Sequence, residues 1–296
     1  MKFFNKIQYV LSIIISLVFI FITIQNINLM DSSNLKLDYI FDNKLQFFLY
    51  LILFLPIHFF LSLKFCKLFS NFKKISIMNS IKVNLIAFTY NLILPAKTGD
   101  FLRFNFLGLK IKNKKKIFNF NLIEKIISLL TLIFLIILST ILTKNYYLNF
   151  VIEIILKYKF YFLFLIFLII FIFFIYFKKF LSFLFLKNSI PFQKLFLLDI
   201  IIWSISFLQI FCAIKILKID INYFETIFIF GVSIIAGLIP ISLGGFGVRD
   251  FMILNLMNLN SLNNDMVLLL IFFNLRYLIP IFLGILISIN YSRNRK

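Results

Sequence analysis

The sequence predicts an all-α, polytopic membrane protein with a single membrane domain, residues 1–296. Three observations predict this class: 62% of the residues are hydrophobic, only 14% are charged, and the mean hydropathy is +1.04. Soluble domains carry about 25% charged residues, so the composition excludes an ordinary soluble domain. The apolar residues also gather in long runs, and about 20 such residues form a helix that crosses a hydrocarbon core.

Six apolar runs are long enough to be membrane spans, and they cover residues 9–24, 45–63, 121–142, 158–177, 195–214 and 266–289. No small-residue cleavage site follows the first run, so we interpret it as a retained span and not as a signal peptide. Two further apolar stretches, 75–107 and 226–257, are interrupted by proline and glycine. These interruptions predict broken helices.

The positive charges decide how the two interrupted stretches are placed. If both crossed the membrane, the basic stretches 64–74 and 95–116 would lie on opposite sides, against the tendency of Lys and Arg to stay cytoplasmic. If each stretch enters and returns on one side, 20 Lys and Arg residues are cytoplasmic and seven are external. The sequence therefore predicts six spans, two re-entrant helical hairpins and both termini in the cytoplasm. The net charge of +20 then indicates cytoplasmic loops at the cell membrane, and we expect no nucleic-acid partner.

An internal repeat relates two pseudo-repeat halves, about 1–145 and 146–296. An offset of 145 residues superimposes Pro95 on Pro240, together with a following glycine and phenylalanine. The same offset carries the first-half spans onto predicted spans of the second half. Each half has three crossings, an odd number, so the sequence predicts an inverted repeat. Interrupted helices in inverted repeats point to a transporter whose site lies where the hairpin tips meet, near the midplane.

The first hairpin contains the polar residues Asn91, Asp100 and Arg103 around Pro95 and Gly99. Asp100 and Arg103 are three positions apart, so they can pair on one helix face. Two interpretations of Arg103 stay open. Its guanidinium either binds the phosphate of an anionic headgroup in a bidentate manner, or extends to the cytoplasmic interface.

The second hairpin contains Gly244, Gly245 and Gly247, followed by Arg249 and Asp250. Backbone amides at a helix start after such a turn can bind an anion. Arg249 and Asp250 either serve function or pair with each other. No strand pattern precedes the glycines and no Gly-Lys-Ser/Thr follows them, so this is not a nucleotide-binding loop.

Arg276 lies eleven residues into the predicted span 266–289, near the bilayer centre. A charge at that depth costs about 3 kcal/mol or more unless it is paired or hydrated, so Arg276 is a candidate for function. It should meet an anionic headgroup or a carboxylate such as Glu124, and Asp199 is another acid that could neutralise an arginine. His58, the only histidine, is expected to be structural, and no metal or other cofactor is predicted.

The chain resembles the membrane domain of the lysylphosphatidylglycerol synthases, a flippase-like family that also occurs as free-standing proteins. Four features in order carry the resemblance: Asn-x-x-x-Pro-Ala-x-x-Gly-Asp-x-x-Arg, then Glu-Lys, then Ile-Pro-x-x-x-Gly-Gly-Phe-Gly-Val-Arg-Asp, then an arginine in the last span. With Asn91, the positions that it marks for substrate binding are Pro95, Gly99, Asp100, Arg103, Glu124, Gly244, Gly245, Gly247, Arg249, Asp250 and Arg276.

The chain also departs from that family. Members often have Glu-Arg-x-x-Asp where this chain has Glu124-Lys125-Ile126-Ile127-Ser128, so one carboxylate partner is missing. They tend to have Glu where Asp100 and Asp250 stand. No aminoacyl-transferase domain follows the last span, so aminoacyl transfer within this chain is not expected.

Three functions stay open from the sequence. The first is a flippase- or scramblase-like transporter whose partners are membrane lipids with anionic or polar headgroups. The second is the membrane component of an enzyme that modifies or glycosylates lipids, which we rank lower because no nucleotide site or nucleophile–base pair is present. The third is an accessory subunit that presents lipid to a separate lipid-modifying enzyme.

Overall fold

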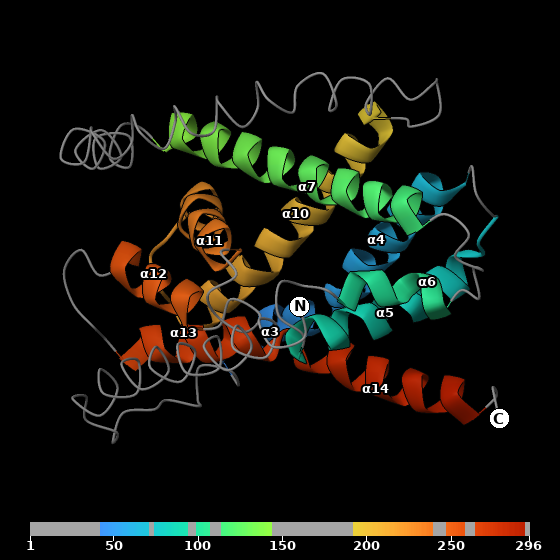
Figure 1. Ribbon diagram of the computed structural model, residues 1–296. Helices are drawn as coiled ribbons and strands as arrows, with labels where there is room; N and C mark the ends of the chain where they lie inside the picture. The colour runs from blue at the N-terminus through green and yellow to red at the C-terminus, as the bar shows by residue number, and fades with distance from the viewer. Residues whose placement is uncertain are drawn as a thin grey trace, which may run out of the picture.

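The computed structural model describes residues 42–70, 74–93, 99–106, 114–143, 192–238, 247–257 and 264–293. These residues form helices and no strands (Figure 1). The helices are α3 (Lys44–Ile52), α4 (Phe54–Phe69), α5 (Ile77–Ile93), α6 (Leu102–Phe106), α7 (Lys114–Leu142), α10 (Phe192–Ile216), α11 (Tyr223–Gly237), α12 (Val248–Met257), α13 (Asn264–Leu275) and α14 (Leu278–Arg293).

Within the described part of the chain, four helical segments are long and apolar enough to cross a membrane, and they match four of the predicted spans: Lys44–Phe69, Phe120–Leu142, Phe192–Ile216 and Leu268–Asn290. The chain is thus a helical membrane protein. The predicted spans 9–24 and 158–177 lie outside the described residues. The six-span arrangement with its re-entrant hairpins therefore stays a prediction.

Two of these spans are interrupted, where the sequence predicted continuous helices. The helix ends at Ile52 and resumes at Phe54, and the last span ends at Leu275 and resumes at Leu278. In each case proline is the third residue of the second segment, Pro56 in α4 and Pro280 in α14. Proline has no backbone N–H, so the carbonyl four residues earlier loses its helical donor and the helix breaks there.

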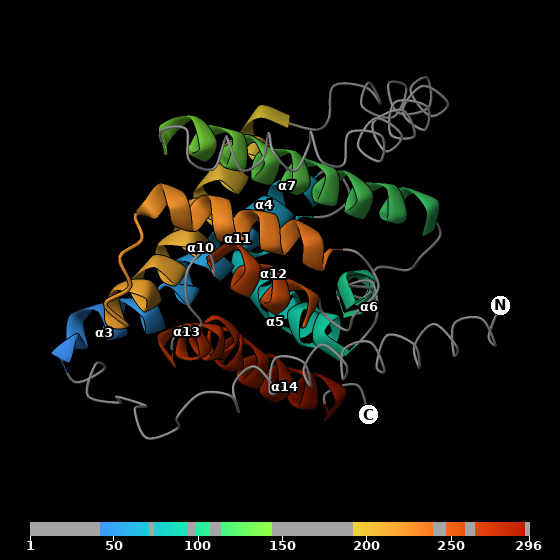
Figure 2. The same cartoon turned by 90° about the vertical axis from the view of Figure 1, so that its left-hand side faces the viewer.

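The bundle has α7 on one side and α13–α14 on the opposite side, with α10 and α4 between them (Figures 1 and 2). α10 packs along α4, α3 and α7. The largest buried cluster includes Phe207 on α10, Phe230 on α11 and Phe273 on α13. A smaller cluster around Phe65 joins α4 to α7 and α10. These helices are held by apolar packing of aromatic and aliphatic side chains.

The two predicted halves contact each other through equivalent pairs of helices. The offset of 145 carries α5 onto α11 and carries α7 onto α13–α14. In the structure α5 packs on α14, and α11 packs on α7. Glycines allow both close approaches: an added Cβ at Gly284 would lie 2.5 Å from the Leu85 carbonyl oxygen, and one at Gly231 would lie 2.7 Å from Ile136 Cγ1. The first helix of each interrupted stretch therefore contacts the last span of the other predicted half.

Each interrupted stretch contains two described helices, α5 and α6 in the first and α11 and α12 in the second. α5 ends two residues before Pro95, and α11 ends three residues before Pro240. The residue before a proline is disfavoured in the helical conformation, which explains both ends. α12 packs back on α11, and it begins after Gly247, whose φ of 85° favours glycine. The hairpin tips themselves, 94–98 and 239–246, lie outside the described residues, so their approach stays a prediction.

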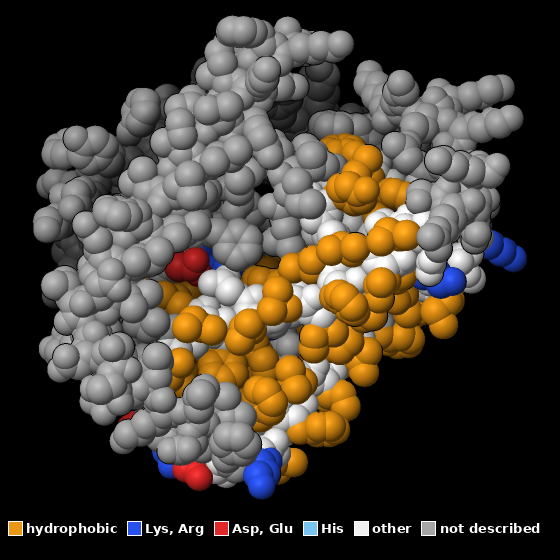
Figure 3. All heavy atoms as spheres, turned by 90° about the horizontal axis from the view of Figure 1, so that it is seen from below, with side chains coloured by type: hydrophobic (Ala, Val, Ile, Leu, Met, Phe, Trp, Pro, Cys, Tyr) orange, Lys and Arg blue, Asp and Glu red, His pale blue; other side chains and the backbone are white. Residues whose placement is uncertain are grey.

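The outer surface of the described helices is strongly apolar. Figure 3 shows the face below the view of Figure 1, over α13 and α14, where hydrophobic side chains predominate. The exposed residues of α14 on this surface include Leu278, Phe282, Ile285, Leu286 and Ile289. A continuous apolar patch of this kind is unusual on a soluble monomer and fits contact with lipid.

Candidate functional site

A cavity of about 480 Å³ lies inside the bundle, between elements of both predicted halves. Sites for small molecules have volumes of about 300–1,000 Å³, so this cavity can hold a polar headgroup. Its apolar lining includes Phe54, Leu61, Phe88, Trp203 and Pro280. Much of its polar lining comes from two clusters of polar and charged side chains.

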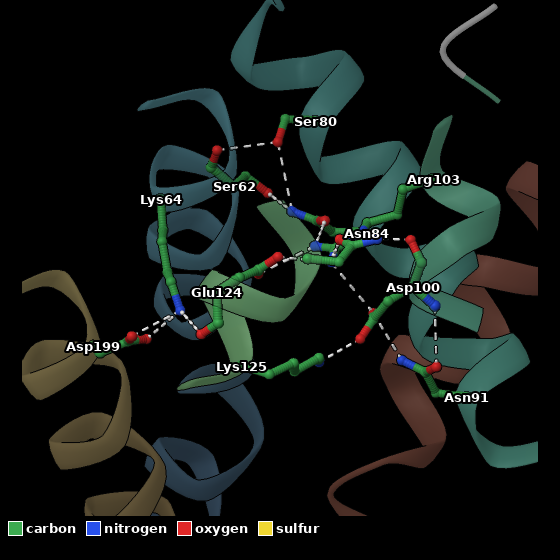
Figure 4. A network of polar contacts seen from close by, with 11 residues as sticks. Ser62, Lys64, Ser80, Asn84, Asn91, Asp100, Arg103, Glu124, Lys125 and Asp199 are labelled. Carbon is green, nitrogen blue, oxygen red and sulfur yellow. Dashed lines mark hydrogen bonds and ion pairs between the residues drawn. The ribbon is translucent and has the colours of Figure 1, made fainter. Parts of the chain in front are cut away.

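The first polar cluster joins α4, α5, α6, α7 and α10 (Figure 4). We define it by its members: Lys64, Asn84, Asn91, Asp100, Arg103, Asn121, Glu124, Lys125 and Asp199.

Arg103 is the centre of this cluster, and its guanidinium is saturated by the protein. Its Nη1 and Nη2 donate to the two oxygens of Glu124 at 3.2 and 2.7 Å. Nη1 also donates to Asn84 and Nη2 to Asn121, at 3.4 and 2.9 Å, and Nε donates to the Asp100 carbonyl at 3.1 Å. A guanidinium has five N–H groups, so no donor remains for a ligand.

Of the two interpretations of Arg103, headgroup binding stays a prediction, although the five N–H groups already have protein partners. Arg103 does not extend to the interface, because only 4% of its surface is exposed. Its acidic partner is Glu124, which we had considered as a partner for Arg276. The expected contact with Asp100 on the same helix face is present but longer, at 3.7 Å.

Asp100 is held just before α6 by three contacts with two other residues. Its Oδ1 accepts from Asn91 Nδ2 at 2.9 Å, its N–H donates to Asn91 Oδ1 at 3.2 Å, and Lys125 pairs with its Oδ2. Gly99 makes this closure possible: an added Cβ would lie 2.6 Å from both the Ala87 carbonyl oxygen and the Asn91 N. Glycine is thus required there for a close approach of backbone to α5.

The sequence placed Lys64 in the basic stretch 64–74, beyond the predicted span 45–63, and the structure corrects this placement. Lys64 lies within α4, is 1% exposed, and pairs with the equally buried Asp199 at 2.7 Å. Its Nζ also donates to the Glu124 carbonyl at 3.4 Å. A buried lysine is tolerated only when its charge is paired, and Asp199 on α10 supplies the pair. Asp199 therefore neutralises a lysine and not an arginine.

The second polar cluster lies at the start of α12 and at the break between α13 and α14. We define it as Arg249, Asp250, Asn274, Arg276 and Tyr277. Arg249 donates to Asn274 Oδ1 and to the Tyr277 hydroxyl, the latter at 3.3 Å, and lies 3.5 Å from the Asp250 carboxylate. Asp250 Oδ2 in turn accepts from the Gly247 N–H at 3.1 Å, which caps α12.

Arg276 differs from Arg103 because it has no acidic partner among the described residues. It donates to the Tyr277 hydroxyl, and its Cζ lies 4.2 Å from the centre of the Phe273 ring and 4.6 Å from that of Tyr277. Its Nε is buried without a hydrogen-bond partner in the described part of the chain. The side chain is half-buried and lines the cavity.

The two clusters therefore differ in charge balance. In the first, the cations Lys64, Arg103 and Lys125 match three carboxylates. In the second, two arginines are matched by Asp250 alone, counting described residues. Among the described residues, the second cluster thus has one more cation than carboxylate, and a bound anion could pair with the cation.

Several polar residues of the cavity region were not singled out from sequence. Asn84 and Asn121 bind Arg103, but this chain is rich in asparagine, so an asparagine in an apolar helix carried little weight. Gln209 lines the cavity and donates to the Tyr50 carbonyl. His58, expected to be structural, also lines the cavity. No group of metal-ligating residues occurs among the described residues.

The structure brings many of the predicted site residues together. Those that line the cavity are Asn91, Asp100, Arg103, Glu124, Arg249 and Arg276. Three more do not line the cavity but fix the backbone next to residues that do: Gly99, Gly247 and Asp250. Those outside the described residues are Pro95, Gly244 and Gly245. Their roles in substrate binding stay predictions.

Comparisons with known proteins place the chain in a family. No match was found among curated proteins or among solved structures. A family model described as the lysylphosphatidylglycerol synthase TM region matches residues 9–284, which includes the predicted first span and both hairpins. This match confirms the resemblance found in the ordered motifs. The chain belongs to the lysylphosphatidylglycerol synthase TM region family.

Proposed function

We propose that the chain is an integral membrane transporter of the flippase or scramblase type, which moves lipids with an anionic or polar headgroup. The headgroup enters the cavity while the acyl chains stay in the surrounding lipid. One observation carries this proposal: Arg276 lines a cavity within a membrane bundle and has no carboxylate partner among the described residues. Membership of the family supports a role in lipid biology.

The physical reason is the cost of burying a charge. A guanidinium at membrane depth costs several kcal/mol unless it meets an anion, a dipole or water. Arg103 avoids this cost through Glu124. Among the described residues, the Arg276 guanidinium meets the Tyr277 hydroxyl and two aromatic faces and no carboxylate. A headgroup phosphate would supply the missing negative charge, and a guanidinium binds phosphate in a bidentate manner.

The reciprocal packing of the halves supports a route to both sides of the membrane. In inverted-repeat transporters, broken helices from the two repeats meet at a central site, and alternating access results from rocking of the repeats. Here each interrupted stretch packs on the last span of the other half, and residues that follow each interruption line one cavity. This arrangement fits six spans, two re-entrant hairpins and cytoplasmic termini.

The test is transport by the purified chain in liposomes without any partner protein, using fluorescent phospholipids and a membrane-impermeant quencher. We expect the native chain to accelerate exchange between leaflets, and Arg276→Leu to abolish most of the acceleration. The matched control is Lys218→Leu, which removes a cation whose side chain is 56% exposed and lies outside the cavity lining. The control should move lipid at the native rate.

Two results would contradict the proposal. Native transport by Arg276→Leu would remove Arg276 from the site. Absence of transport by the native chain would reject independent lipid movement and would favour the accessory subunit that presents lipid to a separate enzyme.

A further inference from the structure

His58 is a buried polar residue that none of the interactions above explains. It lies in the apolar helix α4, is 6% exposed and lines the cavity. Its Nδ1 is buried without a hydrogen-bond partner among the described residues. Its ring contacts are edge-to-face with Phe54 and Phe88, at centroid distances of 6.3 and 5.5 Å. An imidazole usually satisfies its polar atoms when it is buried, so this environment is incomplete.

His58 is connected to the second polar cluster through one aromatic ring. Phe88 contacts the His58 ring at 5.5 Å and the Tyr277 ring at 5.6 Å. The Tyr277 hydroxyl accepts from Arg276. His58, Phe88 and Arg276 thus line one cavity, with the Phe88 ring in contact with both His58 and Tyr277.

We propose that His58 hydrogen-bonds a hydroxyl or amine of the headgroup while Arg276 and Tyr277 hold its phosphate. The substrate class is then a phospholipid whose headgroup carries an N–H or O–H group beyond the phosphate. This inference rests on the proposed function and specifies the ligand of the same cavity. Arg103 is not part of this recognition, because its five N–H groups are already used.

The chemistry of imidazole leads to this class. A neutral imidazole has one N–H donor and one acceptor nitrogen, so it can bind either a hydroxyl or an ammonium group. A quaternary ammonium such as choline has no hydrogen to donate to it. Phosphatidylethanolamine and phosphatidylcholine carry the same net charge, so a comparison between them isolates this one interaction from the electrostatic effect of Arg276. Phosphatidylglycerol tests the hydroxyl, and because it carries a net negative charge, its binding is compared between the native chain and the His58 variant and not with the choline lipid.

Binding can be measured without transport, because the chain has one tryptophan and that residue, Trp203, lines the cavity. Short-chain lipids are titrated into the purified full chain in detergent, and the emission of Trp203 is followed. Loss of one hydrogen bond corresponds to about a fivefold change in affinity. We expect His58→Phe, which keeps the ring contacts, to weaken binding of the ethanolamine and glycerol lipids by about that factor and to leave choline-lipid binding unchanged.

Two further variants separate hydrogen bonding from packing. His58→Gln keeps a donor and an acceptor, so it should recover part of the preference. Phe59→Leu changes a neighbouring side chain that is 43% exposed and does not line the cavity, so it should bind all three lipids as the native chain does.

The possible results decide between the inference and the proposed function. Equal losses for all three lipids in His58→Phe, or no loss for any, overturn the role of His58, while native transport in liposomes leaves the proposed function standing. A native chain that neither binds nor moves any of the three lipids overturns both.

Discussion

Breaking the Arg103–Glu124 pair should destabilise the fold more than removing the pair entirely. Arg103→Leu removes five hydrogen bonds and leaves the Glu124 carboxylate, 5% exposed, without its guanidinium. An unpaired buried charge of this kind costs about 3–5 kcal/mol. The double variant with Arg103→Leu and Glu124→Leu leaves neutral groups to find other partners: the amides of Asn84 and Asn121 and the Asp100 carbonyl. We therefore expect it to recover about 2–3 kcal/mol relative to additivity.

The assay is a double-mutant cycle of the free energy of unfolding, measured by circular dichroism in mixed micelles with increasing SDS. The matched control cycle uses the exposed pair between Lys218 and Asp42, at 3.2 Å with both side chains more than half exposed. Its coupling should stay below about 0.5 kcal/mol because solvent screens it. Additive losses in the Arg103 cycle would refute the argument that a buried charge pair organises the first polar cluster.

Three other changes test separate features. Arg276→Lys keeps the charge but loses the planar fork, so its transport rate should lie between those of the native chain and Arg276→Leu; a native rate would contradict bidentate binding. Gly284→Ala places a Cβ 2.5 Å from the Leu85 carbonyl oxygen, so it should lower the unfolding free energy by about 1–3 kcal/mol, and unchanged stability would argue against this close helix contact. Single cysteines at Asn113 and Asn260 should react with an impermeant reagent from opposite sides, and labelling from one side would reject the inverted arrangement.

Local features of the sequence were sufficient for the class of protein and for where its helices break. Hydropathy located the four spans that the structure describes, because the length and polarity of a segment decide whether it can cross a bilayer. Pro95 and Pro240 marked the ends of α5 and α11, since proline acts on its own backbone neighbours. Pro56 and Pro280 acted in the same way, but their apolar surroundings concealed these breaks.

The predicted end of the span 45–63 shows where local reasoning failed, because α4 continues through Lys64 to Phe69. Lysines between apolar runs usually mark a loop, and Lys64 was interpreted in that way. The residue is buried because Asp199, far along the chain, meets it on the adjoining face of α10. No local pattern in α4 contains that information.

The sequence by itself determined that Arg276 is a costly charge within a membrane span and left two interpretations of Arg103 open, because charge and hydropathy are properties of each segment. Only the tertiary structure decided that the charges of the two arginines are balanced in different ways. The packing of α6 on α5 places Arg103 beside Glu124 of α7, which neutralises its charge, and the protein uses all its donors. The break between α13 and α14 instead places Arg276 against Tyr277 and the cavity, with no described carboxylate beside it. Such partners are chosen by helix packing, since an ion pair forms only where two side chains from distant segments come within a few ångströms.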